Sequence, residues 1–105
     1  MTAQRRVLPN RRRNETFELS FGGLTKGHVI TVGYYDDDTP GEVFISGGKS
    51  GEQVEAIARD GAVVLSLALQ YGVPMESVRS AITRTENGEA MSIVGVVVDK
   101  LMEVK

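Results

Sequence analysis

The hydrophobic pattern of this chain changes period once, at the glycine-rich stretch Gly47–Gly51, and this change limits the folds open to the chain. Before the stretch, apolar residues alternate with polar ones, as Phe17 and Leu19 do around Glu18. A period of two is typical of half-buried strands. After the stretch, apolar residues recur every three or four positions, which is the period of an amphipathic helix. The pattern therefore predicts an α+β fold in which a sheet precedes the helices.

Three strands are expected, at residues 15–21, 28–35 and 42–46. Their links are short and contain Gly, Asp and Pro, which favour turns, so the strands should form an antiparallel meander. Ile30, Val32 and Tyr34 alternate onto one face of the middle strand. A three-stranded sheet under one layer of helices leaves a face and an edge open. We therefore expect a homodimer through that open face, lined by these three residues, or through the edge strand.

A long helix is expected between Gly51 and Gly72, with Ser50 as its N-cap. Glycine is the usual residue just past a helix C-terminus, which places the end of the helix at Gly72. The apolar positions of the expected stripe are Val54, Ile57, Ala58, Gly61, Val64, Leu65 and Ala68. We expect this helix to be central and to pack on one face of the sheet.

The rest of the chain predicts two further helices on the same face. Pro74 suits the first turn of a short helix, and residues 83–89 form a polar loop after it. Residues 91–102 have the spacing of a helix, whereas the β-branched run at 93–98 also fits a strand. We favour the helix for this last segment.

Composition excludes several classes of chemistry. The chain has 105 residues, no Cys and one His, so disulfides, Cys-ligated zinc, iron–sulfur clusters and thiol radicals are ruled out. No apolar run is long enough to cross a bilayer and no signal segment is visible, so we expect a cytoplasmic protein. The length suits one domain, expected at residues 15–105 after an N-terminal arm at residues 1–14.

The N-terminal arm is strongly basic. Its charges come from Arg5, Arg6, Arg11, Arg12 and Arg13, with no acid among the first fourteen residues. Arginine presents a bidentate fork to phosphate oxygens, so nucleic-acid or nucleotide binding is the functional hypothesis for the arm. The alternative is that the arm lies across the acidic surface of its own domain or frays into solvent, since the remainder of the chain is acidic.

The stretch between the last strand and the long helix is a candidate anion site, formed by Gly48, Lys49, Ser50 and Gly51. Free backbone amides at a helix N-terminus attract anions. A complete phosphate-binding loop would need a glycine at position 43, where Val43 stands, so nucleoside-triphosphate hydrolysis is disfavoured. The alternative is a glycine turn with a capping Ser50 and a solvated Lys49.

The remaining polar residues predict no catalytic set, no metal site and no cofactor. Asp36–Asp38 and Glu42 carry carboxylates that hard cations prefer, but a solvated turn is favoured because calcium-loop spacing is lacking. His28 opens a strand without a Ser, Cys or second His partner. We expect it to be an exposed or hydrogen-bonded strand histidine.

One family resemblance covers roughly residues 8–104. The segments that carry it read "LPNRRRNETFELSFGG" from Leu8, "GEVFISGGKSG" from Gly41 and "SLALQYGVP" from Ser66. They resemble the TSCPD domain, a module found near the C-terminus of adenosylcobalamin-dependent (class II) ribonucleotide reductases and also as small free-standing proteins, as we expect here. The resemblance implies an α+β domain linked to deoxynucleotide synthesis.

The resemblance does not imply a reductase, because the radical chemistry of that enzyme needs a large barrel and cysteines that this chain lacks. The expected function is a non-catalytic accessory or interaction module, with a ribonucleotide reductase as its protein partner. The alternative is binding of nucleic acid or a phosphate ligand through the arginine arm and the Gly47–Gly51 turn. An enzyme on a phosphorylated substrate, using that turn and an acid such as Glu42, ranks last.

Overall fold

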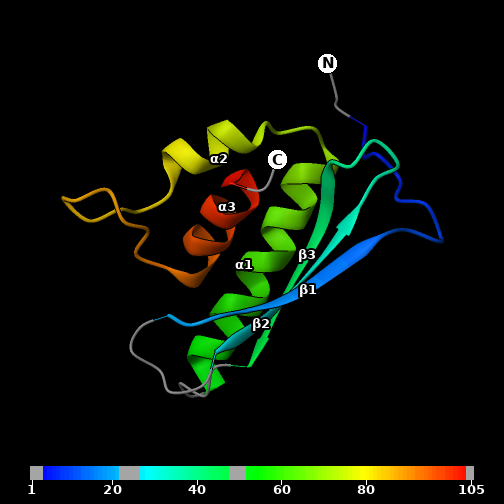
Figure 1. Cartoon of the computed structure of the whole chain (residues 1–105). Coiled ribbons are helices and arrows are strands. Elements are labelled where there is room, and N and C mark those ends of the chain that lie inside the picture. Colours follow the sequence, from blue (N-terminus) through cyan, green and yellow to red (C-terminus); the bar gives the residue numbers. More distant parts are fainter. Residues whose placement is uncertain (1–3, 22–26, 48–51, 104–105) are drawn as a thin grey trace. The chain divides into compact units, whose positions relative to one another are not determined.

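A computed structural model of the chain describes residues 4–21, 27–47 and 52–103 (Figure 1). Three strands precede three helices: β1 (Asn14–Leu19), β2 (His28–Tyr34), β3 (Pro40–Gly47), α1 (Glu52–Gln70), α2 (Met75–Ala81) and α3 (Ile93–Glu103). The chain forms two compact units, Met1–Gly72 and Val73–Lys105. Strands first and helices after confirm the predicted α+β class. No helix within the described ranges is long and apolar enough to cross a membrane.

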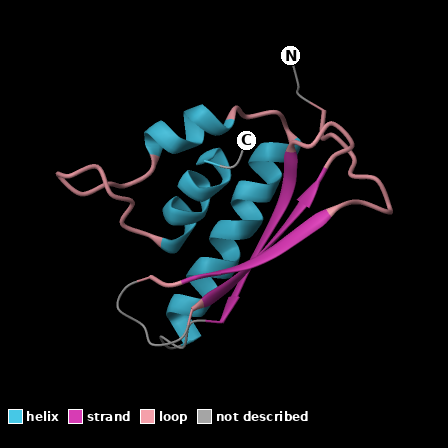
Figure 2. Cartoon of the chain, viewed as in Figure 1, coloured by secondary structure: helices cyan, strands magenta, loops and turns pink. Residues whose placement is uncertain are grey.

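The sheet is the predicted antiparallel meander, with strand order β1-β2-β3 (Figure 2). Ile30 of β2 stands between Phe17 of β1 and Ile45 of β3, and Val32 stands opposite Val43. Aligned apolar side chains on one face fix the register, because a slip by one residue would move them all to the other face. The pattern overestimated the length of β1, which ends at Leu19, and underestimated β3.

The core of the first unit lies between one face of the sheet and α1, which runs along that face (Figure 1). Ile30 and Val32 are 0% exposed, and Ala62 and Leu65 of α1 are buried. Tyr34 is buried as well. The expectation that Ile30, Val32 and Tyr34 line an open face was therefore wrong: the alternation was correct, but this is the face that the helix covers. Thr16 and Thr31 lie on the opposite face, joined by a 3.2 Å hydroxyl contact.

The predicted apolar stripe of α1 was too wide. Ala58, Ala62 and Leu65 are buried, whereas Val54, Ile57 and Val64 are exposed. α1 packs chiefly against one strand, β3, so only a narrow line of mostly small side chains faces the sheet. The helix therefore presents apolar side chains that the sheet does not cover.

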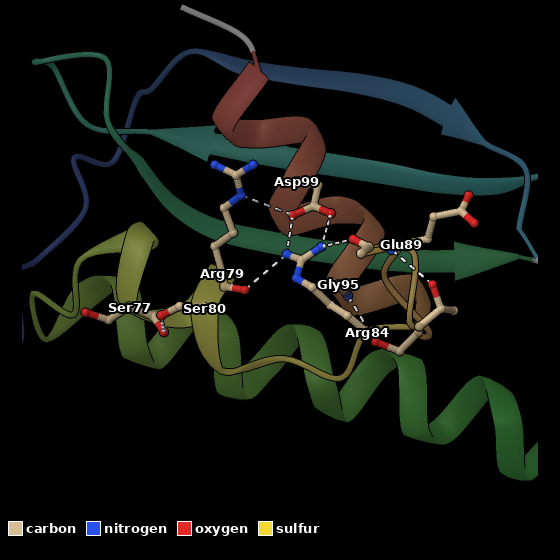
Figure 3. Close-up of polar contacts among 10 residues, drawn as sticks. Ser77, Arg79, Ser80, Arg84, Glu89, Gly95 and Asp99 are labelled. Atoms are coloured by element: carbon tan, nitrogen blue, oxygen red, sulfur yellow. Dashed lines mark hydrogen bonds and ion pairs between the residues drawn. The ribbon is translucent and has the colours of Figure 1, made fainter.

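The second unit is built around one arginine (Figure 3). Arg84, in the loop between α2 and α3, donates to both carboxylate oxygens of Asp99 at 2.7 and 2.9 Å. It also donates to the backbone carbonyls of Arg79 and Gly88 at 3.0 Å each. One planar guanidinium thus joins the end of α2, the loop and α3, a geometry that lysine would not provide.

The last segment is a helix, as favoured. Val97 and Val98 of α3 are 0% exposed, so the β-branched run packs in an interior rather than forming a strand. A Cβ atom on Gly95 would lie 2.9 Å from the Cβ of Ala90 and 3.0 Å from Cδ1 of Ile82. The glycine that made the sequence ambiguous is therefore required by close packing.

Asp99 should make the stability of the chain depend on pH. The hydrogen bonds from Arg84, with the charges of Arg84 and Arg79, hold the pKa of Asp99 below its ordinary value of 3.8 despite partial burial. A lowered native pKa contributes stability that is present above the unfolded pKa and is lost as the pH falls through the native one. We expect the melting temperature of the unmodified chain to fall below about pH 4. Asp99→Asn should melt at a lower temperature at pH 7, and its melting temperature should depend less on pH in the acid range.

The matched control is Glu103→Gln, which removes an exposed carboxylate from the same helix. Thermal unfolding followed by circular dichroism between neutral and acid pH measures both variants. This role of Asp99 would be contradicted if the melting temperature of Asp99→Asn fell as steeply with falling pH as that of the unmodified chain.

Candidate functional site

The basic arm is part of the first unit. The backbone N–H of Arg6 donates to the carbonyl of Gln70 at 2.7 Å, and Nε of Arg5 donates to Oε1 of Gln70 at 2.6 Å. The hydroxyl of Tyr35 donates to the carbonyl of Arg6 at 2.8 Å. The arm is thereby tied to the C-terminal end of α1 and to the residue that follows β2.

Three arm arginines pair with acids of the same unit. Arg6 lies 3.1 Å from Asp37, and Arg12 lies 2.6 Å from Glu42. Arg13 lies 3.5 Å from Glu15 and 3.2 Å from Asp38. The described part of the arm therefore lies across the acidic surface of its own domain and does not fray into solvent. Arg5 bonds the neutral Gln70, and Arg11 is exposed with no ion pair among the described residues.

Two tyrosine rings stack against arginines of the arm. The guanidinium groups of Arg6 and Arg13 stack over the rings of Tyr35 and Tyr34, at 3.7 and 3.9 Å from the ring centroids. The hydroxyl of Tyr34 donates to Glu15 at 2.6 Å. Burial, with this hydrogen bond, raises the pKa of Tyr34 to about 12, so the phenol keeps its proton at neutral pH. The stacked pairs hold the arm through both charge and ring contacts.

The outer edge of β3 is covered by polar side chains of α1. Ser66 Oγ accepts from the N–H of Val43 at 2.8 Å and lies 3.1 Å from its carbonyl oxygen, and Nε2 of Gln70 donates to the carbonyl of Gly41 at 2.8 Å. Ala62, Ser66 and Gln70 stand four residues apart, on one side of the helix. Ser66 and Gln70 were not predicted as site residues from the sequence, although polar residues at this spacing beside an apolar stripe were the available signal.

A groove of about 320 Å³ opens along this edge, between β3 and α1. We call it the β3–α1 groove. It is lined by Arg5, Glu42, Val43, Phe44, Ile45, Arg59, Ala62, Val63, Ser66, Leu67 and Gln70. Val63 and Leu67 of α1, which line it, are 55% and 39% exposed, whereas Phe44 stands beside Thr31 in the register, on the other face of the sheet. An apolar concavity of this kind at the surface marks a binding site more often than isolated apolar residues do.

The charges of the groove do not cancel. Glu42 is held by Arg12, whose guanidinium also contacts the carbonyl of Pro9. Arg5 and Arg59 have no acidic partner within the described residues. The groove therefore combines apolar walls with two uncompensated cations.

Two further sequence predictions concern the glycine-rich turn and His28. Gly48, Lys49, Ser50 and Gly51 lie outside the described residues, and the anion site there stays a prediction. His28 is not exposed, which removes one of the two expected alternatives: it is 3% exposed, and its Nδ1 has no hydrogen-bond partner among the described residues. It stands opposite Gly47 in the register, at the end of the sheet. Within the described ranges, no three His, Cys, Asp or Glu side chains gather as a metal site would require.

A substitution at Gly41 tests whether the arm packs against β3. A Cβ atom there would lie 2.5 Å from Cε2 of Tyr35 and 2.8 Å from Cδ2 of Leu8. We expect Gly41→Ala to destabilise the chain by about 1–3 kcal/mol and to speed tryptic cleavage after the arm arginines, because the added methyl group displaces Leu8. The control is Ser46→Ala at an exposed position of the same strand. Identical melting and cleavage for the two variants would show that the arm does not pack there.

Comparison with known proteins places the chain in one family. The TSCPD domain family matches residues 2–104. The chain is 37% identical over 86 residues to a vitamin B12-dependent ribonucleotide reductase of Agrobacterium fabrum, covering 82% of this chain and 7% of that protein. Its identity to the enzyme of the same name from Rhodopirellula baltica is 37% over 82 residues, covering 78% of this chain and 8% of that protein. For Streptantibioticus cattleyicolor the identity is 35% over 79 residues, covering 75% and 13%.

The chain thus corresponds to only a small part of these reductases. No solved structure matches it. The family match extends over nearly the whole sequence and confirms the resemblance carried by the arm, the third strand and the end of the long helix. This chain belongs to the TSCPD domain family.

Proposed function

We propose that this domain is a non-catalytic interaction module of deoxynucleotide synthesis that docks on a ribonucleotide reductase through the β3–α1 groove. The similarity to part of several vitamin B12-dependent ribonucleotide reductases supports the choice of partner. The absence of cysteine from the sequence supports a role other than thiol chemistry. A cytoplasmic location belongs to the same proposal, since the proposed partner supplies DNA precursors.

The observation that carries this proposal is the exposure of apolar side chains in a groove built from rigid elements. Val63 and Leu67 of α1 line the groove beside the edge of β3, where Ser66 already accepts the N–H of Val43. Covering these side chains with a partner would remove apolar surface from water, at roughly 25 cal/mol per Å². Because the walls are a helix and a strand, little ordering cost is expected on binding.

Val63 and Val64 offer a matched test of docking. They are neighbours of the same type on α1, exposed by 55% and 66%, but only Val63 lines the groove. We expect Val63→Glu to weaken binding to the purified reductase of the same organism by at least roughly tenfold, because the carboxylate must be desolvated on docking. Val64→Glu should change the affinity by less than about twofold.

Binding is measured by calorimetry with the full chain, after circular dichroism has shown that both variants fold. Equal losses for the two variants would place the interface elsewhere, and no binding by the unmodified chain would reject the reductase as partner.

The second candidate function is binding of nucleic acid, a nucleotide or another phosphate ligand through the arm and the Gly47–Gly51 turn. The observation that favours it is Arg11, which is exposed and carries no ion pair among the described residues. Arg6, Arg12 and Arg13 have acidic partners within the chain, so contact with a phosphate would exchange one ion pair for another. This pairing reduces the gain from phosphate contacts.

Salt dependence tests this second function. If the arm binds duplex DNA, the logarithm of the affinity should fall with the logarithm of salt concentration by about 0.9 per phosphate contact. Arg11→Gln should then reduce the slope by about 0.9, whereas Lys100→Gln on α3 should leave it unchanged. Fluorescence anisotropy with a labelled duplex measures the slopes. An affinity and slope that Arg11→Gln does not alter would argue against the arm as the contact.

A further inference from the structure

The arginines of the described structure divide into two groups. Those in ion pairs are Arg6, Arg12, Arg13, Arg79 and Arg84. The others are Arg5, Arg11 and Arg59, which have no acidic partner among the described residues. Two of these three, Arg5 and Arg59, line the β3–α1 groove. The other described cations outside ion pairs, Arg11 and Lys100, are not among the residues that line the groove.

The two cations belong to different elements and stand at the same concavity. Arg5 comes from the arm, where Gln70 orients its guanidinium at 2.6 Å without neutralising it. Arg59 is exposed on α1. Glu42 does not compensate them, because it is bound by Arg12 at 2.6 Å and its side chain is only 17% exposed. A partner that carries carboxylates would supply the charge that the groove lacks.

The strand edge determines how such a partner is recognised. An extended peptide usually adds to a sheet through the free N–H and C=O groups of an edge strand. In β3 the N–H of Val43 already donates to Ser66, and the carbonyl of Gly41 already accepts from Gln70. Strand addition is therefore hindered at Val43 and Gly41, and side-chain contacts gain weight in the recognition.

The same capping disfavours a nucleotide. Its base and sugar edges would need polar partners, and the two neutral polar side chains of the groove, Ser66 and Gln70, are engaged with β3. The surface that remains is apolar, formed chiefly by Val63 and Leu67, with a cation at Arg5 and another at Arg59. This combination fits a peptide that has a large apolar side chain beside acidic ones.

We propose that the β3–α1 groove binds an acidic peptide segment by inserting one large apolar side chain between the edge of β3 and Val63 and Leu67 of α1, while flanking carboxylates contact Arg5 and Arg59. The inference deepens the proposed function and rests on it only for the identity of the partner, since it names the part of a reductase that would be recognised. The charge of the groove, rather than its apolar area alone, is what selects this segment.

Charge reversal provides the first test. Arg59→Glu should weaken binding to the purified reductase by at least about tenfold, and raised salt should reduce the difference between this variant and the unmodified chain. Arg11→Glu is the matched control, because it reverses the remaining unpaired arginine outside the groove, and it should change the affinity by less than about twofold. Equal effects of the two reversals would overturn the inference and leave the docking proposal standing.

A synthetic probe makes the test independent of the reductase. The probe is a fluorescein-labelled twelve-residue peptide with a central Leu flanked by Glu residues, compared with one in which Lys replaces every Glu and one in which Ser replaces the Leu. We expect the full chain to bind the first peptide at least about tenfold more tightly than either other peptide, and Arg59→Glu to remove this preference. Arg59→Gln, which removes the charge without reversing it, should give an intermediate loss.

The outcomes separate the two proposals. Binding of the acidic peptide without binding of the reductase would support the groove and reject the partner. Equal binding of the three peptides, or a preference that Arg59→Glu and Arg11→Glu reduce equally, would overturn the inference. Displacement of the acidic peptide by dATP, with direct dATP binding that needs Arg59, would assign the groove to a nucleotide and overturn it as well.

Discussion

The first unit depends on the contact between α1 and the outer edge of β3. An edge strand exposes a row of N–H and C=O groups that must find partners or invite pairing with another chain. Here the helix supplies partners: Ser66 accepts from the N–H of Val43, and Gln70 donates to the carbonyl of Gly41. This contact sets the distance and direction of α1 over the sheet. As a result, small residues such as Ala62 face the core, and Val63 and Leu67 stand at the border of the groove.

Gln70 links this contact to the N-terminal arm. Its backbone carbonyl and side-chain oxygen accept from Arg6 and Arg5, while its amide nitrogen donates to β3. The arm thereby completes the unit, and most of its positive charge is used within the fold, against Asp37, Glu42 and the acids around Tyr34. A run of arginines in a sequence predicts local positive charge. Whether that charge is available to a ligand depends on whether the domain places acids beside the arginines.

Much of the fold follows from the sequence because alternation and helical spacing are local signals. They located three strands and three helices, including the last helix, for which Gly95 left a choice between helix and strand. They did not determine which face of β2 the helix covers, so Ile30, Val32 and Tyr34 were assigned to the wrong environment. Nor did they show that α1 lies mainly on one strand, which leaves Val54, Ile57 and Val64 exposed. The groove was missed for the same reason: Arg59, Phe44 and Ser66 are separated in sequence, and only the packing of α1 on β3 brings them together.

The two unpaired cations of the groove show how a small domain can combine stability with recognition. Arg12 and Arg84 act inside the fold, where each forms a close contact with a carboxylate and with a backbone carbonyl. Arg5 and Arg59 are held by the same framework but receive no carboxylate from it. Since exposed ion pairs contribute little to stability, leaving these charges unpaired costs the fold little. It leaves them available to a partner, where docking on apolar walls would exclude water and strengthen each charge contact.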